Sequence, residues 1–145
     1  MMKNTEAVEL EYDLSSGGHR MTRLRKTLID VFTLRRQPLS THDLLDILKK
    51  RGLTPHKVTL YRELDFLKER KVIVQVDMTD GLQRFEFIYR EHHHHAVCTE
   101  CHTIQDIELE SEDVYLKKMI KTPKYFKIVS HAIEFFGICN ACKNV

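Results

Sequence analysis

The sequence lacks the features that would place it in a membrane or an oxidising compartment. None of its apolar runs approaches the roughly 18 residues that span a bilayer, and its N-terminus has no apolar segment typical of a secretion signal. It contains no internal repeat, and its only low-complexity segment is a run of histidines. We therefore expect a cytoplasmic protein of one or two small domains, with no membrane partner.

Net charge is also nearly absent, at +2, but the charges are unevenly placed. Residues 15–71 hold 14 Lys and Arg against 6 Asp and Glu, a balance of +8, whereas the rest holds 9 basic and 15 acidic residues, a balance of −6. A basic segment beside an acidic one indicates a polyanion-binding unit next to a unit that binds something else. A solvated helical surface would give the same asymmetry.

The sequence contains only four cysteines, and all of them fall in two CxxC pairs, Cys98/Cys101 and Cys139/Cys142, separated by 37 residues. Thiolates at this spacing are what zinc needs for a closed tetrahedral site. Four thiolates leave no vacant position on the ion, so the predicted zinc is structural rather than catalytic. Disulfides are the alternative, but a reducing cytoplasm disfavours them.

The basic segment is predicted to form three helices. They cover residues 22–33, about 41–51 and about 54–70, and their expected N-caps are Thr22, Ser40 and Thr54. Asp43 stands in the capping-box position of the second helix, Leu39 and Leu44 can form its hydrophobic staple, and Gly52 ends it. Pro55 suits the first turn of the third helix. Helices joined by a short Gly-containing turn are typical of helix-turn-helix organisation, although an ordinary three-helix bundle fits equally well.

Two alternating segments after the third helix favour the DNA-binding interpretation. Residues 72–78, with Val72, Val74, Val76 and Met78 on one face, and residues 83–89 read as strands joined by a turn at Asp80-Gly81. Three basic helices followed by a two-stranded hairpin form a winged helix, whose third helix enters the major groove of DNA. On this helix His56, Lys57, Thr59 and Arg62 are predicted to face outward.

The acidic segment begins with His92-His93-His94-His95. In an extended chain, alternation sends His92 and His94 to one side and His93 and His95 to the other, which gives two pairs of ligands. Imidazole with carboxylate suits iron(II), manganese, zinc or nickel. A run of four histidines can also be an expression tag or a solvated surface stretch, but this run is internal and flanked by strand patterns. Short strands are predicted around 96–97 and 104–109, a helix over 111–121, and a strand over 127–136 on which His131 reads as a core residue.

These motifs together resemble the ferric uptake regulator family of bacterial metal-responsive repressors, over roughly residues 18–142. The motifs that carry the resemblance are HHHH-x2-C-x2-C, the second CxxC, Thr22-x2-Arg25, Val58-Thr59-Leu60-Tyr61-Arg62 and Asp80-Gly81-x2-Arg84-Phe85-Glu86. The resemblance implies an α+β fold, with a winged helix-turn-helix DNA-binding domain at 1–89 and a small α/β dimerisation domain at 90–145. It also implies a homodimer on a double-stranded DNA operator.

The resemblance further assigns site residues. The structural zinc site takes the four cysteines, Cys98, Cys101, Cys139 and Cys142. A sensory site for Fe2+, Mn2+ or Zn2+ between the domains takes Glu86, His93, His95 and Asp106. A second site within the dimerisation domain takes His92, His94, Asp113 and His131, so the resemblance turns His131 from a core residue into a ligand. The predicted DNA-binding residues are Arg25, Lys57, Thr59, Tyr61 and Arg62.

The chain also departs from the family pattern. The family's sensory site usually takes a ligand just before the second helix, where this chain has Pro38 and Leu39, and the glycine after the first CxxC is His102. His42, Gln37 or His19 could substitute for the missing ligand. The absence of a fifth cysteine slightly disfavours zinc sensing.

An enzyme is not expected. No His is followed two residues later by Glu and no Pro precedes a CxxC, so the signatures of a zinc deaminase are missing. The CxxC contexts do not fit a thiol oxidoreductase. The remaining alternative to a metal-dependent repressor of metal homeostasis or peroxide response is a zinc-stapled metal-binding module without DNA function.

Overall fold

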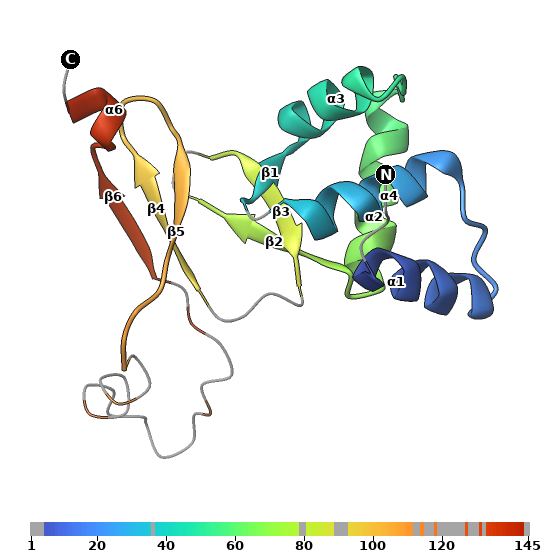
Figure 1. Ribbon diagram of the computed structural model, residues 1–145, viewed down its shortest axis with the longest axis horizontal. Coiled ribbons are helices and arrows are strands. Elements are labelled where there is room, and N and C mark those ends of the chain that lie inside the picture. The colour runs from blue at the N-terminus through green and yellow to red at the C-terminus, as the bar shows by residue number, and fades with distance from the viewer. Residues whose placement is uncertain are drawn as a thin grey trace. The chain divides into compact units, whose positions relative to one another are not determined.

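The computed structural model describes residues 5–35, 37–78, 81–88, 93–111, 114, 118, 127, 131 and 133–143. The chain divides into two compact units, Met1–Arg90 (unit 1) and Glu91–Val145 (unit 2). Figure 1 labels their elements. Unit 1 contains α1 (Thr5–Ser16), α2 (Arg23–Leu34), β1 (Leu39–Ser40), α3 (Thr41–Lys50), α4 (Lys57–Glu69), β2 (Ile73–Asp77) and β3 (Gln83–Phe87). Unit 2 contains β4 (His94–Cys98), β5 (Ile104–Ile107), β6 (Glu134–Gly137) and α6 (Asn140–Lys143).

The first two predicted caps are confirmed. The Thr22 side chain accepts a hydrogen bond from the Arg25 backbone N–H at 3.1 Å, and α2 follows. At α3, Ser40 and Asp43 form a reciprocal capping box, in which each side chain accepts the other residue's backbone N–H. Gly52, at a φ of 72°, follows the end of α3, as predicted from its freedom to adopt left-handed backbone angles.

The predicted start of the third helix is wrong. The cap of α4 is His56, which makes no side-chain cap bond, and the helix begins at Lys57 rather than at Pro55. Pro55 and the extended His56 therefore precede the helix, although a proline is compatible with a first helical turn. The consequence is that the exposed face of the helix begins directly at Lys57.

A three-stranded antiparallel sheet in the order β1-β3-β2 accompanies these helices, which confirms a winged helix. The pairing of β1 with β3 was not predicted, because two residues are too short for a periodic signal. The predicted buried face is confirmed only in part: Val72 and Met78, which flank β2, are 1% and 5% exposed, whereas Val74 is 38% exposed and Ile73, on the opposite face, is 1% exposed. The register pairs Ile73 with Phe87, so these side chains share the core face of the sheet.

The core of unit 1 is apolar and is drawn from its helices and its sheet. The largest fully buried side chains of this unit are Phe32, Leu28, Ile29, Leu44, Leu48, Leu60, Leu64, Leu67, Ile73, Val31 and Val72. The leucines of α4 among them recur at positions i, i+4 and i+7, so one face of the helix is buried and the opposite face is left for other contacts.

Unit 2 is built on a sheet in the order β5-β4-β6. β4 is antiparallel to β5 and parallel to β6. The predicted strand at 127–136 begins later than expected, at Glu134, so His131 and Ile133 precede it; residues 128–130 and 132 lie outside the described residues. Most of the predicted helix at 111–121 also lies outside them. No helix among the described residues is long and apolar enough to cross a membrane.

Candidate metal and nucleic-acid sites

The two CxxC pairs are brought together by the sheet of unit 2. Cys98 ends β4 and Cys101 lies in the turn that leads to β5, while Cys139 and Cys142 flank the start of α6 after β6. Because β4 and β6 are parallel and Cys98 is paired with Gly137, the two CxxC turns (the knuckles) emerge from the same end of the sheet. Thr99 reinforces this junction, since its backbone N–H donates to the Gly137 carbonyl at 2.8 Å.

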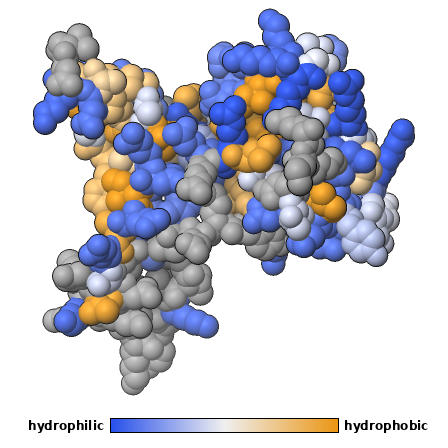
Figure 2. Space-filling model, viewed as in Figure 1, coloured by the Kyte–Doolittle hydropathy of each residue, from blue (hydrophilic) through white to orange (hydrophobic). Residues whose placement is uncertain are grey.

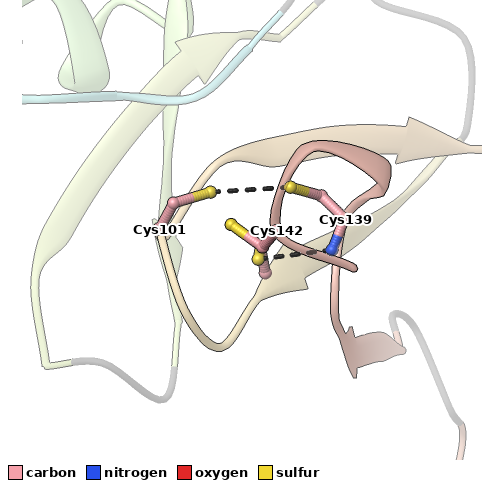
Figure 3. Close-up of side chains that lie close together, drawn as sticks. Cys101, Cys139 and Cys142 are labelled. Carbon is pink, nitrogen blue, oxygen red and sulfur yellow. Dashed lines mark hydrogen bonds between the residues drawn. The ribbon is translucent and has the colours of Figure 1, made fainter. Parts of the chain in front are cut away.

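The four sulfurs converge on one point. All lie within 4.8 Å of one another, and the Sγ atoms of Cys101 and Cys139 are 3.7 Å apart. Figure 3 shows the thiols of Cys101, Cys139 and Cys142 turned toward a common centre. Tetrahedral zinc with bonds of about 2.3 Å holds its sulfurs about 3.8 Å apart. The four cysteines are free thiols, so the donor set and its spacing fit zinc, and the disulfide alternative is not what the structure contains.

Hydrogen bonds prepare part of this cluster for metal. Backbone N–H groups of Cys101 and Cys139 point at the sulfur of Cys98 and lower its pKa to about 6; the bond from Cys139 is 3.3 Å long. The Thr103 hydroxyl, 3.2 Å from the Cys101 sulfur, lowers the pKa of that thiol. In contrast, the neighbouring sulfurs of Cys101 and Cys139 raise the pKa of Cys142 to about 12.

Thr103 is a supporting residue that the sequence motifs did not single out. A hydroxyl two residues after a metal-ligating cysteine was the signal that could have found it. His102, between the two, has a φ of 59° and an exposed side chain. A residue with a Cβ rarely adopts this left-handed geometry, so the turn explains why glycine suits this position.

The histidine run follows the predicted alternation where it is described. The rings of His93 and His95 lie 4.9 Å apart, while His94 points elsewhere and lies 5.9 Å from His131. His95 is the cross-strand partner of Asp106 on β5, so three of the four predicted sensory ligands share one face of unit 2. Glu86, the fourth, lies on β3 of unit 1.

The second predicted site is described in part. His94 is buried and His131 is exposed, so His131 is not the apolar core residue that its strand pattern alone indicated. His92 and Asp113 lie outside the described residues.

The predicted DNA-binding residues separate into two groups. Lys57, Thr59, Tyr61 and Arg62 are all exposed on α4, opposite its buried leucines. Arg25 on α2 is different, because its side chain is only 12% exposed and it forms an ion pair with Glu63 of α4 at 2.8 Å. No local sequence pattern indicates this pair, because its members are 38 positions apart.

Comparison with known proteins identifies relatives of this whole arrangement. The chain is 30% identical over 138 residues to the ferric uptake regulation protein of Bacillus subtilis, covering 92% of this chain and 91% of the relative. Its fold matches the Helicobacter pylori ferric uptake regulator, a protein described as having three functional metal-binding sites, with a TM-score of 0.79 at 20% identity over 99% of this chain and 95% of the other.

A zinc uptake regulator solved with zinc and DNA matches with a TM-score of 0.59 at 25% identity, over 98% of this chain and 97% of the other. The model of the ferric uptake regulator family matches residues 16–136. The chain belongs to the ferric uptake regulator family.

Proposed function

We propose that this protein is a metal-dependent DNA-binding repressor that acts as a homodimer and controls metal homeostasis or a peroxide response. Members of the family are transcription regulators rather than enzymes. The observation that carries the proposal is the division of α4 into a buried leucine face and an exposed face bearing Lys57, Tyr61 and Arg62. A helix of this kind in a winged helix is placed to read base edges while its cations contact phosphates.

Each part of the proposed DNA surface has a distinct role. Arg62 can donate two hydrogen bonds to a guanine, Thr59 can contact a thymine methyl or a base edge, and Lys57 supplies charge to a phosphate. The solved zinc uptake regulator that resembles this chain was bound to DNA, which supports the assignment. In the proposed division, residues 1–89 bind DNA and residues 90–145 bind metal and dimerise.

The proposed regulatory metal is held by His93, His95 and Asp106 together with Glu86. Two imidazoles and two carboxylates form a borderline donor set that suits Fe2+, Mn2+ or Zn2+. Only six residues separate Glu86 from His93, so a metal held by both would restrain the chain that joins the two units. Such a metal favours the DNA-competent population by its differential affinity for that state.

Two further metal sites complete the proposal. The four cysteines hold structural zinc, because their sulfurs fit a closed tetrahedron. His94 and His131, together with His92 and Asp113, form a second non-cysteine site; its support is the 5.9 Å separation of the first two rings.

The proposed dimer surface includes β6. This strand lies at one edge of the sheet in unit 2, and apolar residues gather along it (Figure 2). Phe135, Phe136 and Ile138 are 38%, 49% and 57% exposed. Apolar side chains beside a strand edge favour burial against a second copy of the chain.

The test is DNA binding with and without metal. Fluorescence anisotropy would follow a labelled duplex from the region upstream of this protein's own gene, at low salt, with Mn2+ as an air-stable probe. We expect Mn2+ to tighten binding by roughly 5- to 150-fold. His93→Ala should abolish this gain while zinc content stays constant. Binding that ignores Mn2+, or no binding at all, would leave a metal-binding module without regulated DNA function.

The helix assignment has a matched control. Arg62→Ala should cost about 1–3 kcal/mol of binding free energy. Lys68→Ala removes the same charge from the far end of α4, where Lys68 pairs with Asp65 at 3.2 Å, and should change binding little. Equal losses in the two variants would show that α4 contributes only diffuse charge.

A further inference from the structure

The Arg25 side chain is held inside unit 1 by directed bonds. Its Nε and Nη2 donate to the two carboxylate oxygens of Glu63 at 2.8 and 3.2 Å, and its Nη1 donates to the Arg20 carbonyl at 2.7 Å. This bidentate geometry is the strongest form of an arginine–carboxylate pair. With 12% and 15% of the two side chains exposed, water competes weakly for either partner.

An aromatic ring completes the arrangement. The Arg25 guanidinium lies 3.7 Å from the ring centroid of Phe66, a residue of α4 that packs against the apolar core. The His19 ring meets the same phenylalanine edge-on, with centroids 5.1 Å apart. Glu63 and Phe66 are three positions apart, which places them on one side of α4. Arg25 therefore contacts α4 at two points, through an ion pair with Glu63 and through a cation–π contact with Phe66.

The side of the helix that Arg25 contacts adjoins the exposed side. Thr59 lies one turn before Glu63, and Arg62 directly precedes it. Because each residue of a helix turns the chain by about 100°, fixing Glu63 and Phe66 fixes the direction in which those two residues point. A rotation of α4 that broke the contacts of Arg25 with Glu63 and Phe66 would also turn the proposed DNA-contacting side chains of this helix.

We propose that Arg25 is a positioning residue for DNA recognition. Its contacts with Glu63 and Phe66 set the rotation of α4 about the helix axis, and Arg25 itself makes no bond to DNA. The proposal rests on the proposed DNA-binding function. The proposal also explains why an acidic residue, Glu63, lies beside a face that is proposed to bind a polyanion. Paired with Arg25, the carboxylate is neutralised; without Arg25 it would be an uncompensated anion next to phosphates.

The two interpretations of Arg25 predict opposite effects of changing Glu63. If Arg25 contacts a phosphate, removing Glu63 frees the guanidinium and removes a repulsive charge, so DNA affinity rises. If Arg25 positions α4, removing Glu63 releases the helix and leaves a half-buried cation without its carboxylate partner, so discrimination between DNA sequences falls. Replacing both partners by apolar residues of similar size relieves the unpaired charge and often restores stability.

The experiment is a double-mutant cycle on the full-length, zinc-loaded dimer with Mn2+ present. The variants are Arg25→Met, Glu63→Met and the double variant, with Lys26→Met as the matched control. Lys26 is the next cation on α2, and its ammonium lies 3.6 Å from Glu11 of α1 rather than on α4. The probes are a duplex that the wild-type protein selects from a random library and a scrambled duplex. Circular dichroism corrects each affinity for the folded fraction.

We expect each single variant to lower the ratio of selected to scrambled affinity roughly tenfold, about the effect of one mismatched base pair. The double variant should discriminate better than either single variant, and Lys26→Met should match the wild type. The slope of log K against log salt should be unchanged in the double variant, which loses no phosphate contact and leaves no uncompensated carboxylate, whereas the loss of a direct contact would lower the magnitude of the slope by about 0.9.

Arg25→Lys keeps the positive charge but cannot form the two parallel hydrogen bonds to the Glu63 carboxylate. This variant replaces Arg25→Met in the experiment if Arg25→Met folds poorly. Positioning predicts that Arg25→Lys loses discrimination at an unchanged salt slope; retained discrimination would overturn the proposal. So would a higher DNA affinity in Glu63→Met, or additive effects in the double variant. If the wild-type protein selects no sequence at all, the proposed DNA-binding function fails instead, so the two failures are distinguishable.

Discussion

The two units of this protein use different means to hold their chains together. Unit 1 has a continuous apolar cluster that runs from α1 to β3. Among the described residues of unit 2, the buried side chains are two aliphatic residues, Val97 and Ile104, beside Cys98, His94 and His95. The apolar cluster stabilises unit 1, whereas the described part of unit 2 combines two buried aliphatic side chains with buried cysteine and histidine side chains. Small domains with little apolar core depend on metal ligation for folding, so we expect zinc to stabilise unit 2.

Removing zinc should have the largest effect and should separate the units. Cys139→Ser, or a strong chelator, takes away the ligation that ties β6 to the β4–β5 turn. We expect unit 2 to lose its cooperative unfolding transition while unit 1 keeps its own, because the apolar cluster of unit 1 contains no metal ligand. Calorimetry, together with hydrogen exchange resolved by peptide, would measure this. Simultaneous loss of both transitions would contradict the comparison.

A core substitution should have the converse effect. Leu64→Ala removes a fully buried side chain of α4 and should lower the free energy of unfolding of unit 1 by about 2–5 kcal/mol. Urea denaturation gives the value, and metal analysis should show unchanged zinc. Val58, on the same helix but 62% exposed, provides the control, since Val58→Ala should change stability by less than about 0.5 kcal/mol.

The capping box tests whether unit 1 also depends on local polar bonds. Ser40→Ala removes the acceptor for the Asp43 N–H and should destabilise unit 1 by about 1 kcal/mol. Thermal unfolding followed by circular dichroism would detect the shift, and Ser40→Thr, which keeps the hydroxyl, should recover most of it. A loss as large as that of Leu64→Ala would mean that apolar burial does not dominate unit 1.

The smallest effect is expected at the surface. Asp65 pairs with Lys68 at 3.2 Å, but the Lys68 and Asp65 side chains are 40% and 65% exposed. Solvent and salt screen such a pair, so Asp65→Ala should change the stability of unit 1 by at most about 0.5 kcal/mol in urea denaturation. A clear loss that vanishes at high salt would show that exposed ion pairs matter in this unit.

Several features were predictable because their signals are local. The caps of α2 and α3 depend on residues three positions apart, and each CxxC motif brings two sulfurs together within one turn. The incorrect predictions concern the start of α4 and part of the buried face of β2, where contacts between elements outweigh the local sequence pattern. Pro55 satisfied the composition of a helix start, yet the helix begins two residues later. Val74 satisfied the alternation of β2, yet pairing with β3 buries Ile73 instead.

The sequence alone determined the chemistry of this protein: a basic winged helix, two CxxC pairs, and a histidine run whose alternation sends its rings to different sides. It did so because capping, alternation and ligand spacing operate over a few residues. Tertiary structure decided which distant groups meet. The parallel pairing of β4 with β6 joins two knuckles 37 residues apart, and the packing of α2 on α4 turns Arg25 toward Glu63. Only the packing of whole elements sets such distances, and no local pattern contains them.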